Sequence, residues 1–547
     1  ALRVTGSFLE MAAGDAWAGR LGGLIKRSGE PVIRQALRAG MKFLGTQFVM
    51  GETVADAIKH ARGDEKKGYS ISYDILGEGA RTDAQAKAYV ASYLSGIREI
   101  AAASRAAHLF ERPGISVKLS ALHARYSVTQ TDRVMAELLP RLKSILRVGM
   151  ECNIAVSLDA EEANRLELEL EIYQHLLEDP EFAAFEGIGF VLQAYQKRAV
   201  YVVEALCALA TNLKRRIPIR LVKGAYWDSE IKYAQVMGLP GYPVFTRKEY
   251  TDVSYLACAE VLLKNAAAIY PQFATHNALT VATILTLAEQ HGVGTEGFEF
   301  QRLHGMGESL HDQLVSMSAS RADGGLAPKP PPQGETHAFL RAERYATPKQ
   351  TEESVAPSAS RLAMEGYASP KQGVESLFAS GNKNYRVRIY APVGAHKDLL
   401  AYLIRRLLEN GANSSFVHLL MDKETAIDDL TVSPLAHAEH YAATPNPITP
   451  LPANLYGEHR PNPLGLDFGY RSLRIPFMQA VEAKLGTPKC PSDMPVSQIA
   501  ASMLAAHNAF VAWDKTPVKQ RAEILRRAAA LLDERRAQFV ALCISAA

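Results

Sequence analysis

The feature that most constrains the fold is an alternation between short apolar runs rich in β-branched residues and amphipathic helical segments. The runs are Ile115–Leu119, Ile154–Leu158, Ile188–Leu192, Ile217–Val222, Gln272–Thr275, Phe298–Leu303, Val387–Tyr390 and Ser415–Leu419. Such alternation predicts parallel βαβ units. Eight strands are the number that closes a (β/α)8 barrel. An open doubly wound sheet is the rival architecture, although no predicted strand is followed by the GxGxxG pattern of its dinucleotide-binding version.

The composition and hydrophobic pattern along the sequence predict four regions. Residues 1–70 form a helical N-terminal segment, and residues 71–425 form the barrel, interrupted by an insertion at about 316–384 that is rich in Ser, Gly, Pro and Ala. Residues 426–495 are proline-rich and predict a loop-like linker, and residues 496–547 predict amphipathic helices. The insertion joins a helix to the next strand, so we expect it at the N-terminal face of the barrel, away from the face that carries chemistry.

Composition excludes several functional classes. A net charge of +3 is too balanced for a nucleic-acid-binding footprint. The sequence contains no run of 18 apolar residues, so we expect no membrane-spanning helix. The five cysteines show no paired spacing, which favours a reducing cytoplasm over a disulfide framework. Because neither the cysteines nor the histidines have zinc-ligand spacing, we expect no metal site.

Polar or aromatic residues stand at or just beyond the C-terminal end of nearly every predicted strand. They are Lys118, Ser120, Asp159, Gln193, Arg220, Lys223, Tyr226, Thr275, His276, Asn277, His304 and Tyr390. In a barrel these ends meet at one face and carry the active site. Lys118 and Asp159 follow adjacent strands and can pair. The donor-rich group of Gln193, Arg220, Lys223 and His276 suits the phosphates and heterocycle of a cofactor.

A later helical stretch carries unbalanced positive charge. Arg405 and Arg406 lie three and four residues after Tyr402, and Glu409 follows at the same spacing, which places all four along one helix stripe. One glutamate cannot neutralise two arginines in an apolar helix. The pair is therefore either an anion site, with a carboxylate or phosphate as the ligand, or two side chains that extend to solvent.

Several of these stretches resemble proline dehydrogenase. They are Ser116-Val-Lys-Leu-Ser, Ser157-Leu-Asp-Ala-Glu-Glu, Leu221-Val-Lys-Gly-Ala-Tyr-Trp-Asp, Ala274-Thr-His-Asn, Arg302-Leu-His-Gly-Met-Gly, Arg388-Ile-Tyr-Ala-Pro-Val-Gly and the run from Tyr402 through Val417. The chain is similar, over about residues 5–310 and 385–425, to the proline dehydrogenase part of the bifunctional bacterial proline utilization A family. The insertion departs from that family, whose corresponding connection is much shorter.

The tail around Ala505–Leu542 resembles the opening helices of that family's aldehyde dehydrogenase module. We therefore expect a chain truncated before the catalytic region of that module, without aldehyde dehydrogenase activity.

The resemblance implies a distorted (β/α)8 barrel that binds FAD and oxidises L-proline to Δ1-pyrroline-5-carboxylate by hydride transfer to flavin N5. This is the first step of proline catabolism to glutamate. The family passes its electrons to a quinone, which implies a cytoplasmic protein with possible peripheral contact at the inner membrane face.

The resemblance also implies residue roles. Lys118 matches an active-site lysine and Asp159 its partner. Arg405 and Arg406 match the residues that hold the proline carboxylate, and Glu78 matches the acidic partner of the first of these arginines. The expected ring-contacting residues are Tyr226, Leu303, Tyr390 and Tyr402. The expected FAD-binding residues are Gln193, Arg220, Val222, Lys223, Gly224, Ala225, Trp227, Thr275, His276, Asn277 and Glu409.

Two other enzyme classes and one non-enzymatic class stay open. Another flavin-binding barrel, such as a folate reductase, would be reduced by a nicotinamide. A Schiff-base barrel would use Lys118 as its nucleophile. A non-catalytic fragment would bind no flavin at all.

Overall fold

The protein is described by a computed structural model. The structure describes residues 47–75, 77–319, 385–395, 402, 405, 432–441, 446–457, 460–486 and 494–546. These residues fall into two compact units, residues 1–464 and residues 465–547.

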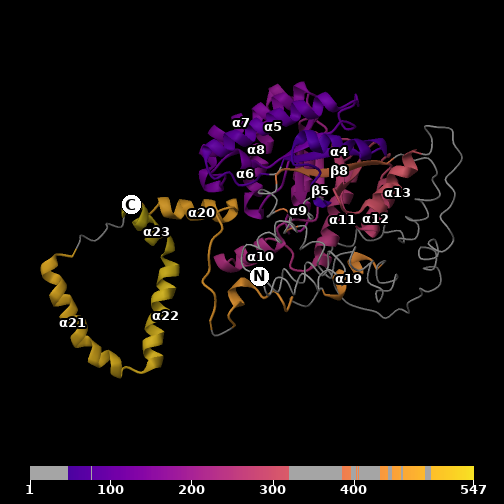
Figure 1. Cartoon of the computed structure of the whole chain (residues 1–547). Helices are drawn as coiled ribbons and strands as arrows, with labels where there is room; N and C mark the ends of the chain where they lie inside the picture. The colour runs from indigo at the N-terminus through magenta and orange to yellow at the C-terminus, as the bar shows by residue number, and fades with distance from the viewer. Residues whose placement is uncertain are drawn as a thin grey trace, which may run out of the picture. The chain divides into compact units, whose positions relative to one another are not determined.

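The first unit contains a closed barrel of parallel strands in the order β1 to β8 (Figure 1). The strands are β1 Ser70–Ile75, β2 Gly114–Val117, β3 Ala155–Leu158, β4 Ile188–Gln193, β5 Ile217–Val222, β6 Ile269–Ala274, β7 Glu299–Leu303 and β8 Arg386–Val393. Closure is made by β1 and β8, which pair from Ser70 with Arg388 through Ile75 with Val393. The predicted (β/α)8 barrel is confirmed.

The predicted strand set differs from the barrel strands at its first and last members. Strand β1 was assigned to no strand, and β2 to β8 were counted as the first seven. The last predicted strand, Ser415–Leu419, lies outside the described residues, and the barrel is complete without it. The sequence of β1 is Ser-Ile-Ser-Tyr-Asp-Ile, in which Ser72 and Asp74 alternate with apolar residues. Both polar side chains are buried, so this strand lacks the continuous apolar run typical of buried parallel strands.

Helices cover the outside of the barrel (Figure 1). Their bounds are α4 Val54–Lys66, α5 Asp83–Ala103, α6 Leu119–Leu122, α7 Thr131–Glu151, α8 Leu166–Glu178, α9 Ala199–Asn212, α10 Trp227–Met237, α11 Lys248–Lys264, α12 Ala278–Gln290 and α13 Glu308–Ala319. In α7, Val134, Leu138, Leu142 and Ile145 recur at helical spacing and are fully buried. This apolar stripe is what fixes the helix against the sheet.

Helix α5 begins at a side-chain cap. The hydroxyl of Thr82 accepts a hydrogen bond from the amide of Gln85 at 3.2 Å. We expect Thr82→Ala to lower the free energy of unfolding by about 1 kcal/mol, because an N-terminal amide loses its partner. Thr82→Ser keeps the acceptor and should stay close to the parent in chemical denaturation. Equal midpoints for the alanine variant and the parent would contradict the capping role.

The barrel interior near the N-terminal ends of the strands contains a buried ion pair. The Arg388 guanidinium, in β8, contacts Glu299 of β7 at 2.7 and 3.0 Å and also donates to the carbonyls of Phe110 and Arg112. Arg388 is 4% exposed and Glu299 is 1% exposed. A buried ion pair whose polar atoms find further partners does not leave an uncompensated charge. This pair therefore closes the N-terminal side of the barrel, and the site lies toward the other end.

The predicted linker is more ordered than its proline content indicated. It contains α19 Pro434–His440 and the short 3-10 helix η6 Pro452–Asn454 in the first unit, and α20 Arg471–Glu482 in the second. Pro434 occupies the first turn of its helix, where a missing N–H is harmless. The loop prediction for these stretches was wrong because a proline in the first turn, such as Pro434, is compatible with a helix.

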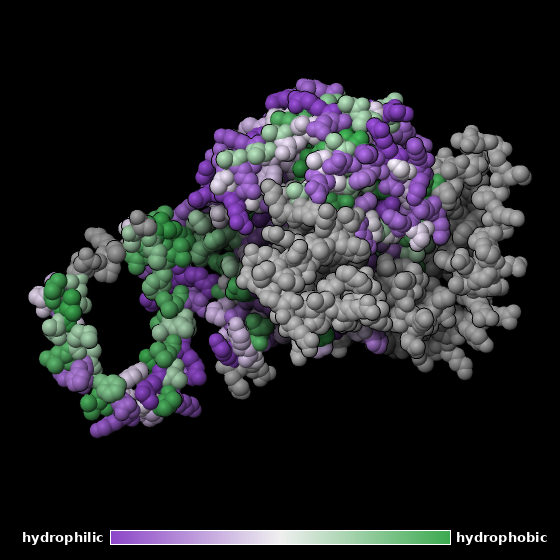
Figure 2. Space-filling model, in the orientation of Figure 1, coloured by the Kyte–Doolittle hydropathy of each residue, from purple (hydrophilic) through white to green (hydrophobic). Residues whose placement is uncertain are grey.

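The second unit contains α20 and the predicted tail helices, observed as α21 Val496–Lys515, α22 Val518–Glu534 and α23 Arg536–Ala546. Among its described residues, the buried apolar side chains are Val481 and Ala541. Large apolar residues are exposed along these helices, including Met503, Phe510 and Leu525. Figure 2 shows hydrophobic (green) surface along this unit. In the part of the chain that the structure describes, no helix has the length and apolar character needed to cross a membrane.

Candidate active site

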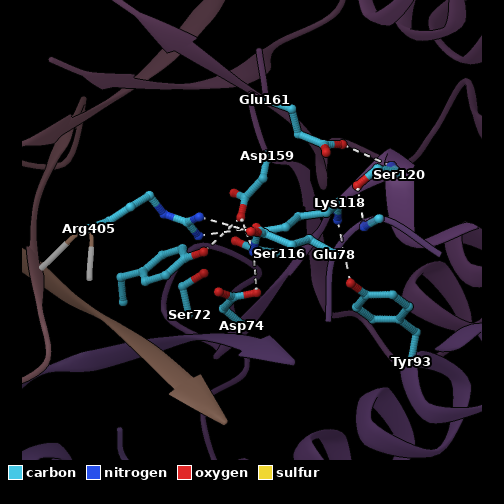
Figure 3. A network of polar contacts seen from close by, with 12 residues as sticks. Ser72, Asp74, Glu78, Tyr93, Ser116, Lys118, Ser120, Asp159, Glu161 and Arg405 are labelled. Atoms are coloured by element: carbon cyan, nitrogen blue, oxygen red, sulfur yellow. Dashed lines mark hydrogen bonds and ion pairs between the residues drawn. The ribbon is translucent and has the colours of Figure 1, made fainter. Parts of the chain in front are cut away.

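The C-terminal ends of β1, β2 and β3 bring one lysine and two aspartates together (Figure 3). The Lys118 ammonium, just after β2, lies 2.8 Å from Asp74 Oδ1 and 3.4 Å from Asp159 Oδ2. All three residues are buried, with exposures of 6%, 1% and 7%. The predicted contact between Lys118 and Asp159 is present, but the shorter contact is made to Asp74, which was not predicted.

This arrangement keeps Lys118 protonated. Burial by itself lowers the pKa of the lysine, but the carboxylate of Asp74, the phenol of Tyr390 and the carboxylate of Asp159 outweigh it and hold the pKa well above its usual value. Burial raises the pKa of Asp74, and the nearby Lys118 ammonium opposes that change. Lys118 is therefore a fixed cation at neutral pH and not a free base.

A second cation balances the second carboxylate. Arg220, in β5, donates from Nη1 to Asp159 Oδ1 at 3.1 Å and to Ser116 Oγ at 2.9 Å, and from Nη2 to Ser72 Oγ at 3.0 Å. Tyr390 donates its hydroxyl to Asp159 Oδ2 at 2.7 Å. Arg220 Nε is buried and has no partner among the described residues. The guanidinium thus has a donor left for a ligand at the barrel face.

Arg405 and Glu78 form an ion pair at the same end of the barrel (Figure 3). Arg405 donates from both terminal nitrogens to Glu78, at 2.8 and 3.1 Å, and its guanidinium lies 5.1 Å from the centre of the Tyr226 ring. Burial tends to raise the pKa of Glu78, but the hydrogen bonds and charge of Arg405, together with Lys118, lower it overall. Glu78 is consequently ionised at neutral pH, and its predicted pairing with Arg405 is present.

The loop after β5 is the most open part of the candidate site. Gly224, Ala225 and Trp227 are exposed, and Val222 and Lys223 are partly buried. Gly224 has a φ of 146°, and a Cβ at this position would lie 2.4 Å from the Tyr195 ring, so only glycine fits. The Ala225 amide donates to Gln193 Oε1 at 3.1 Å. The backbone here is accessible to a cofactor, and its hydrogen bond to Gln193 fixes its position.

Other predicted cofactor residues are already engaged by the protein. Lys223 pairs with Asp252, and the Trp227 indole donates to the Phe245 carbonyl at 2.8 Å. His276 Nε2 accepts from the amide of Leu303 at 3.0 Å. The Asn277 side chain accepts from the amide of Thr280 and so caps α12. These contacts hold the loops after β5 and β6 in place.

Of the remaining predicted residues, some are described by the structure and others are not. Tyr402 is 5% exposed and packs with Leu303, Phe48, Val49 and Met306. Thr275 is buried beside its loop, where its hydroxyl accepts from the amide of Asn277. Arg406 and Glu409 lie outside the described residues. Among the described residues no cluster of three or more His, Cys, Asp or Glu side chains is arranged to hold a metal ion.

Sequence reasoning missed Ser72, Asp74, Ser116 and Glu161. The first two lie in the strand that was not predicted, where the alternation of polar and apolar residues was the available signal. Ser116 faces the interior from inside an apolar run, and its hydroxyl accepts a hydrogen bond from Arg220 Nη1. Glu161 accepts a hydrogen bond from the amide of Ser120 at 2.9 Å, and nothing in its sequence spacing indicates that contact.

Comparisons with known proteins match this architecture. A family model described as proline dehydrogenase matches residues 57–328 and 371–419, so its gap falls within the predicted insertion. A second model, described as the aldehyde dehydrogenase family, matches residues 489–546.

Three similar proteins illustrate the match. "Bifunctional protein PutA" of Salmonella typhimurium is 43% identical over 556 residues, which cover 95% of this chain and 38% of that protein. "Proline dehydrogenase" of Deinococcus radiodurans is 29% identical over 286 residues, covering 52% of this chain and 82% of that protein. A crystal structure of bifunctional proline utilization A (PutA) superimposes with a TM-score of 0.73 at 41% identity, covering 95% of this chain and 46% of that one. The chain thus spans less than half the length of its bifunctional relatives.

Proposed function

We propose, from the premise that this chain belongs to the proline dehydrogenase family, that it oxidises L-proline to Δ1-pyrroline-5-carboxylate with FAD as its cofactor. The observation that carries the proposal is the buried Lys118 ammonium, held between Asp74 and Asp159 and close to the Arg405–Glu78 pair. Buried charges held at the C-terminal end of a barrel are typical of a catalytic site.

Lys118 acts through its charge. A fixed cation disfavours a second cation beside it, so a substrate amine bound near Lys118 gives up its proton more readily. Loss of a hydride from the carbon next to nitrogen requires that neutral amine. The lysine is too firmly protonated to remove the proton itself, since Asp74, Tyr390 and Asp159 raise its pKa. Its role is electrostatic and positional.

The arginine pair supplies the site for the proline carboxylate. A guanidinium binds a carboxylate through two parallel hydrogen bonds, and Arg405 already binds Glu78 in this way. Arg406 is the second proposed donor. Tyr226, Leu303, Tyr390 and Tyr402 would contact the ring, and their bulk favours a small cyclic amine.

The chemistry of the donors fits FAD. When bound, FAD supplies the hydride acceptor for this oxidation. The free Nε of Arg220 is a buried donor suited to a ring nitrogen, and Gln193 would hydrogen-bond the same heterocycle. The open backbone at Val222, Gly224 and Ala225, with Lys223, Trp227, Thr275, His276, Asn277 and Glu409, would hold the remainder of the cofactor.

The electron acceptor and the location follow from the same family. We propose that a quinone reoxidises the enzyme. We also propose that the protein works in the cytoplasm with peripheral contact to the inner membrane face. Anaerobic reduction by proline followed by a soluble quinone tests this step. Reoxidation by the quinone is expected, and a reduced spectrum that persists after its addition would contradict it.

The Schiff-base alternative requires a neutral lysine, whereas the pKa of Lys118 is raised. The deciding experiment is the absorbance spectrum of the purified protein. A yellow flavin spectrum that bleaches anaerobically on addition of L-proline is the expected result. A colourless protein that takes up no added FAD would refute the proposal, and bleaching by a nicotinamide alone would favour a reductase.

A further inference from the structure

A closed circuit of contacts links residues of the candidate substrate site. It runs from Glu78 through the next residue, Gly79, to Ser120, then to Glu161, and returns through Gln193, Ala225, Tyr226 and Arg405 to Glu78. In Figure 3, Lys118 and Asp159 lie between Arg405 on one side and Ser120 and Glu161 on the other. The circuit joins the last residue of β4 to the loops that follow β1, β2, β3 and β5.

Ser120 holds the loop that carries Glu78. Its hydroxyl accepts a hydrogen bond from the amide of Gly79 at 2.9 Å, and its carbonyl accepts one from the amide of Ala80 at 2.8 Å. Two successive amides directly after Glu78 are thus bound by one residue. Because each residue of a loop otherwise has considerable backbone freedom, these two contacts restrict where the Glu78 carboxylate can lie.

Glu161 in turn holds Ser120. Its Oε1 accepts from the amide of Ser120 at 2.9 Å, and its Oε2 accepts from Arg165 at 2.7 Å. Ser120 is 3% exposed and Glu161 is 4% exposed. Hydrogen bonds that involve a charged group are stronger than neutral ones, and a buried carboxylate with both oxygens bound is firmly placed.

Glu161 also reaches the opposite side of the site through its main chain. Its carbonyl accepts from Gln193 Nε2 at 2.7 Å, and Gln193 Oε1 accepts from the amide of Ala225 at 3.1 Å. Ala225 directly precedes Tyr226, the ring that lies against Arg405. Contacts therefore connect Glu161 to both members of the ion pair. They lead to Glu78 through Ser120, and to Arg405 through Gln193, Ala225 and Tyr226.

We propose that Ser120 and Glu161 are positioning residues that set the place of Glu78 against Arg405 and thereby the affinity for the substrate carboxylate. The inference rests on the proposed function for its substrate. Neither residue contacts the ion pair directly, so both act through the backbone of the loops they hold.

The first test is the steady-state kinetics of Ser120→Ala with L-proline. Within the loop that carries Glu78, this variant keeps the carbonyl contact to Ala80 and removes only the acceptor for Gly79. It also removes the hydroxyl that hydrogen-bonds the Glu161 carboxylate. KM is expected to rise about three- to tenfold, the effect of one neutral hydrogen bond, with kcat nearly unchanged. Ser92→Ala, which removes an exposed hydroxyl from α5, is the matched control and should leave KM unchanged. A lower kcat with unaltered KM would contradict the proposal.

A double-mutant cycle separates positioning from general destabilisation. If Ser120 acts through Glu78, then Ser120→Ala should change KM by less than about twofold when Glu78 is already glutamine. An undiminished effect in the Glu78→Gln background would overturn the inference. If Ser120→Ala does not fold, Glu161→Gln replaces it in the cycle; it keeps an oxygen acceptor and should raise KM in the same direction by a smaller factor.

Hydrogen exchange gives a readout that is independent of activity. In Ser120→Ala, peptides covering residues 77–82 are expected to exchange faster than in the parent, while peptides from α9 keep their parental rate. Unchanged exchange at residues 77–82 would refute the positioning role even in an active enzyme. If L-proline does not reduce the flavin of the parent protein, the proposed function is refuted. The exchange result would still decide the role of Ser120.

Discussion

Replacing Arg405 with methionine is expected to raise KM for L-proline by about 10- to 150-fold, the effect of losing one charge-assisted contact. Methionine keeps much of the arginine stem's volume and removes the guanidinium. The bidentate hydrogen bonds to Glu78 are lost as well, so the mouth of the site loses its ion pair. The measurement is initial rate against proline concentration, together with the inhibition constant of tetrahydrofuran-2-carboxylate, which has the ring and carboxylate of proline but no amine.

Two controls sharpen this prediction. Arg405→Lys keeps the charge without the planar fork and should give a smaller rise in KM. Arg147→Met removes a guanidinium that pairs with Glu181 on an exposed helix surface, and it should leave KM unchanged. An inhibition constant that is the same in Arg405→Met and the parent would rule out a carboxylate contact at this residue.

Replacing Lys118 with methionine is expected to lower kcat at neutral pH by about 100-fold, because the site loses the cation that disfavours a protonated substrate amine. Breaking the buried ion pair should also lower the free energy of unfolding by about 3–5 kcal/mol. Asp74 and Asp159 would then favour the protonated amine of proline. The pH at which kcat/KM rises should therefore move to a higher value than in the parent. The measurement is kcat/KM across the pH range in which the variant stays folded.

The charge balance of the cluster provides the control. Lys118→Met/Asp74→Asn again matches one carboxylate, Asp159, with one cation, Arg220. This double variant should recover most of the lost thermal stability but not the turnover. Recovery of turnover as well would show that Lys118 is needed only to neutralise Asp74. A Lys118→Met enzyme with parental kcat would remove the electrostatic role altogether.

Sequence periodicity was sufficient for the barrel but not for all of its strands. Strands β2 to β8 were found because each is an apolar run beside a helical pattern. Strand β1 was missed because its inward-facing Ser72 and Asp74 belong to the site and not to an apolar interior. The strands whose side chains carry chemistry are thus the ones for which hydrophobic pattern is the weakest guide.

The site was predictable where one residue sits at one strand end and unpredictable where contacts join several loops. Lys118, Asp159 and Arg220 were identified from position alone. The contact between Lys118 and Asp159 was expected, whereas the contact between Arg220 and Asp159 was not. The contact between Ser120 and Glu161 depends on how the short helix α6 orients an amide toward the loop after β3. Local spacing carries no information on such a pairing, since its two members are 41 residues apart.

The pairing of β1 with β8 has a consequence for synthesis on the ribosome. Ile71 and Arg388, which meet across this seam, are 317 residues apart in the sequence. At typical elongation rates the first strand is made about 15–60 s before its last neighbour. During this interval β1 has one unpaired edge, and unpaired edges promote association between chains. The barrel therefore remains vulnerable to aggregation until its final strand emerges, and this interval is the one in which a chaperone would have the greatest effect on yield.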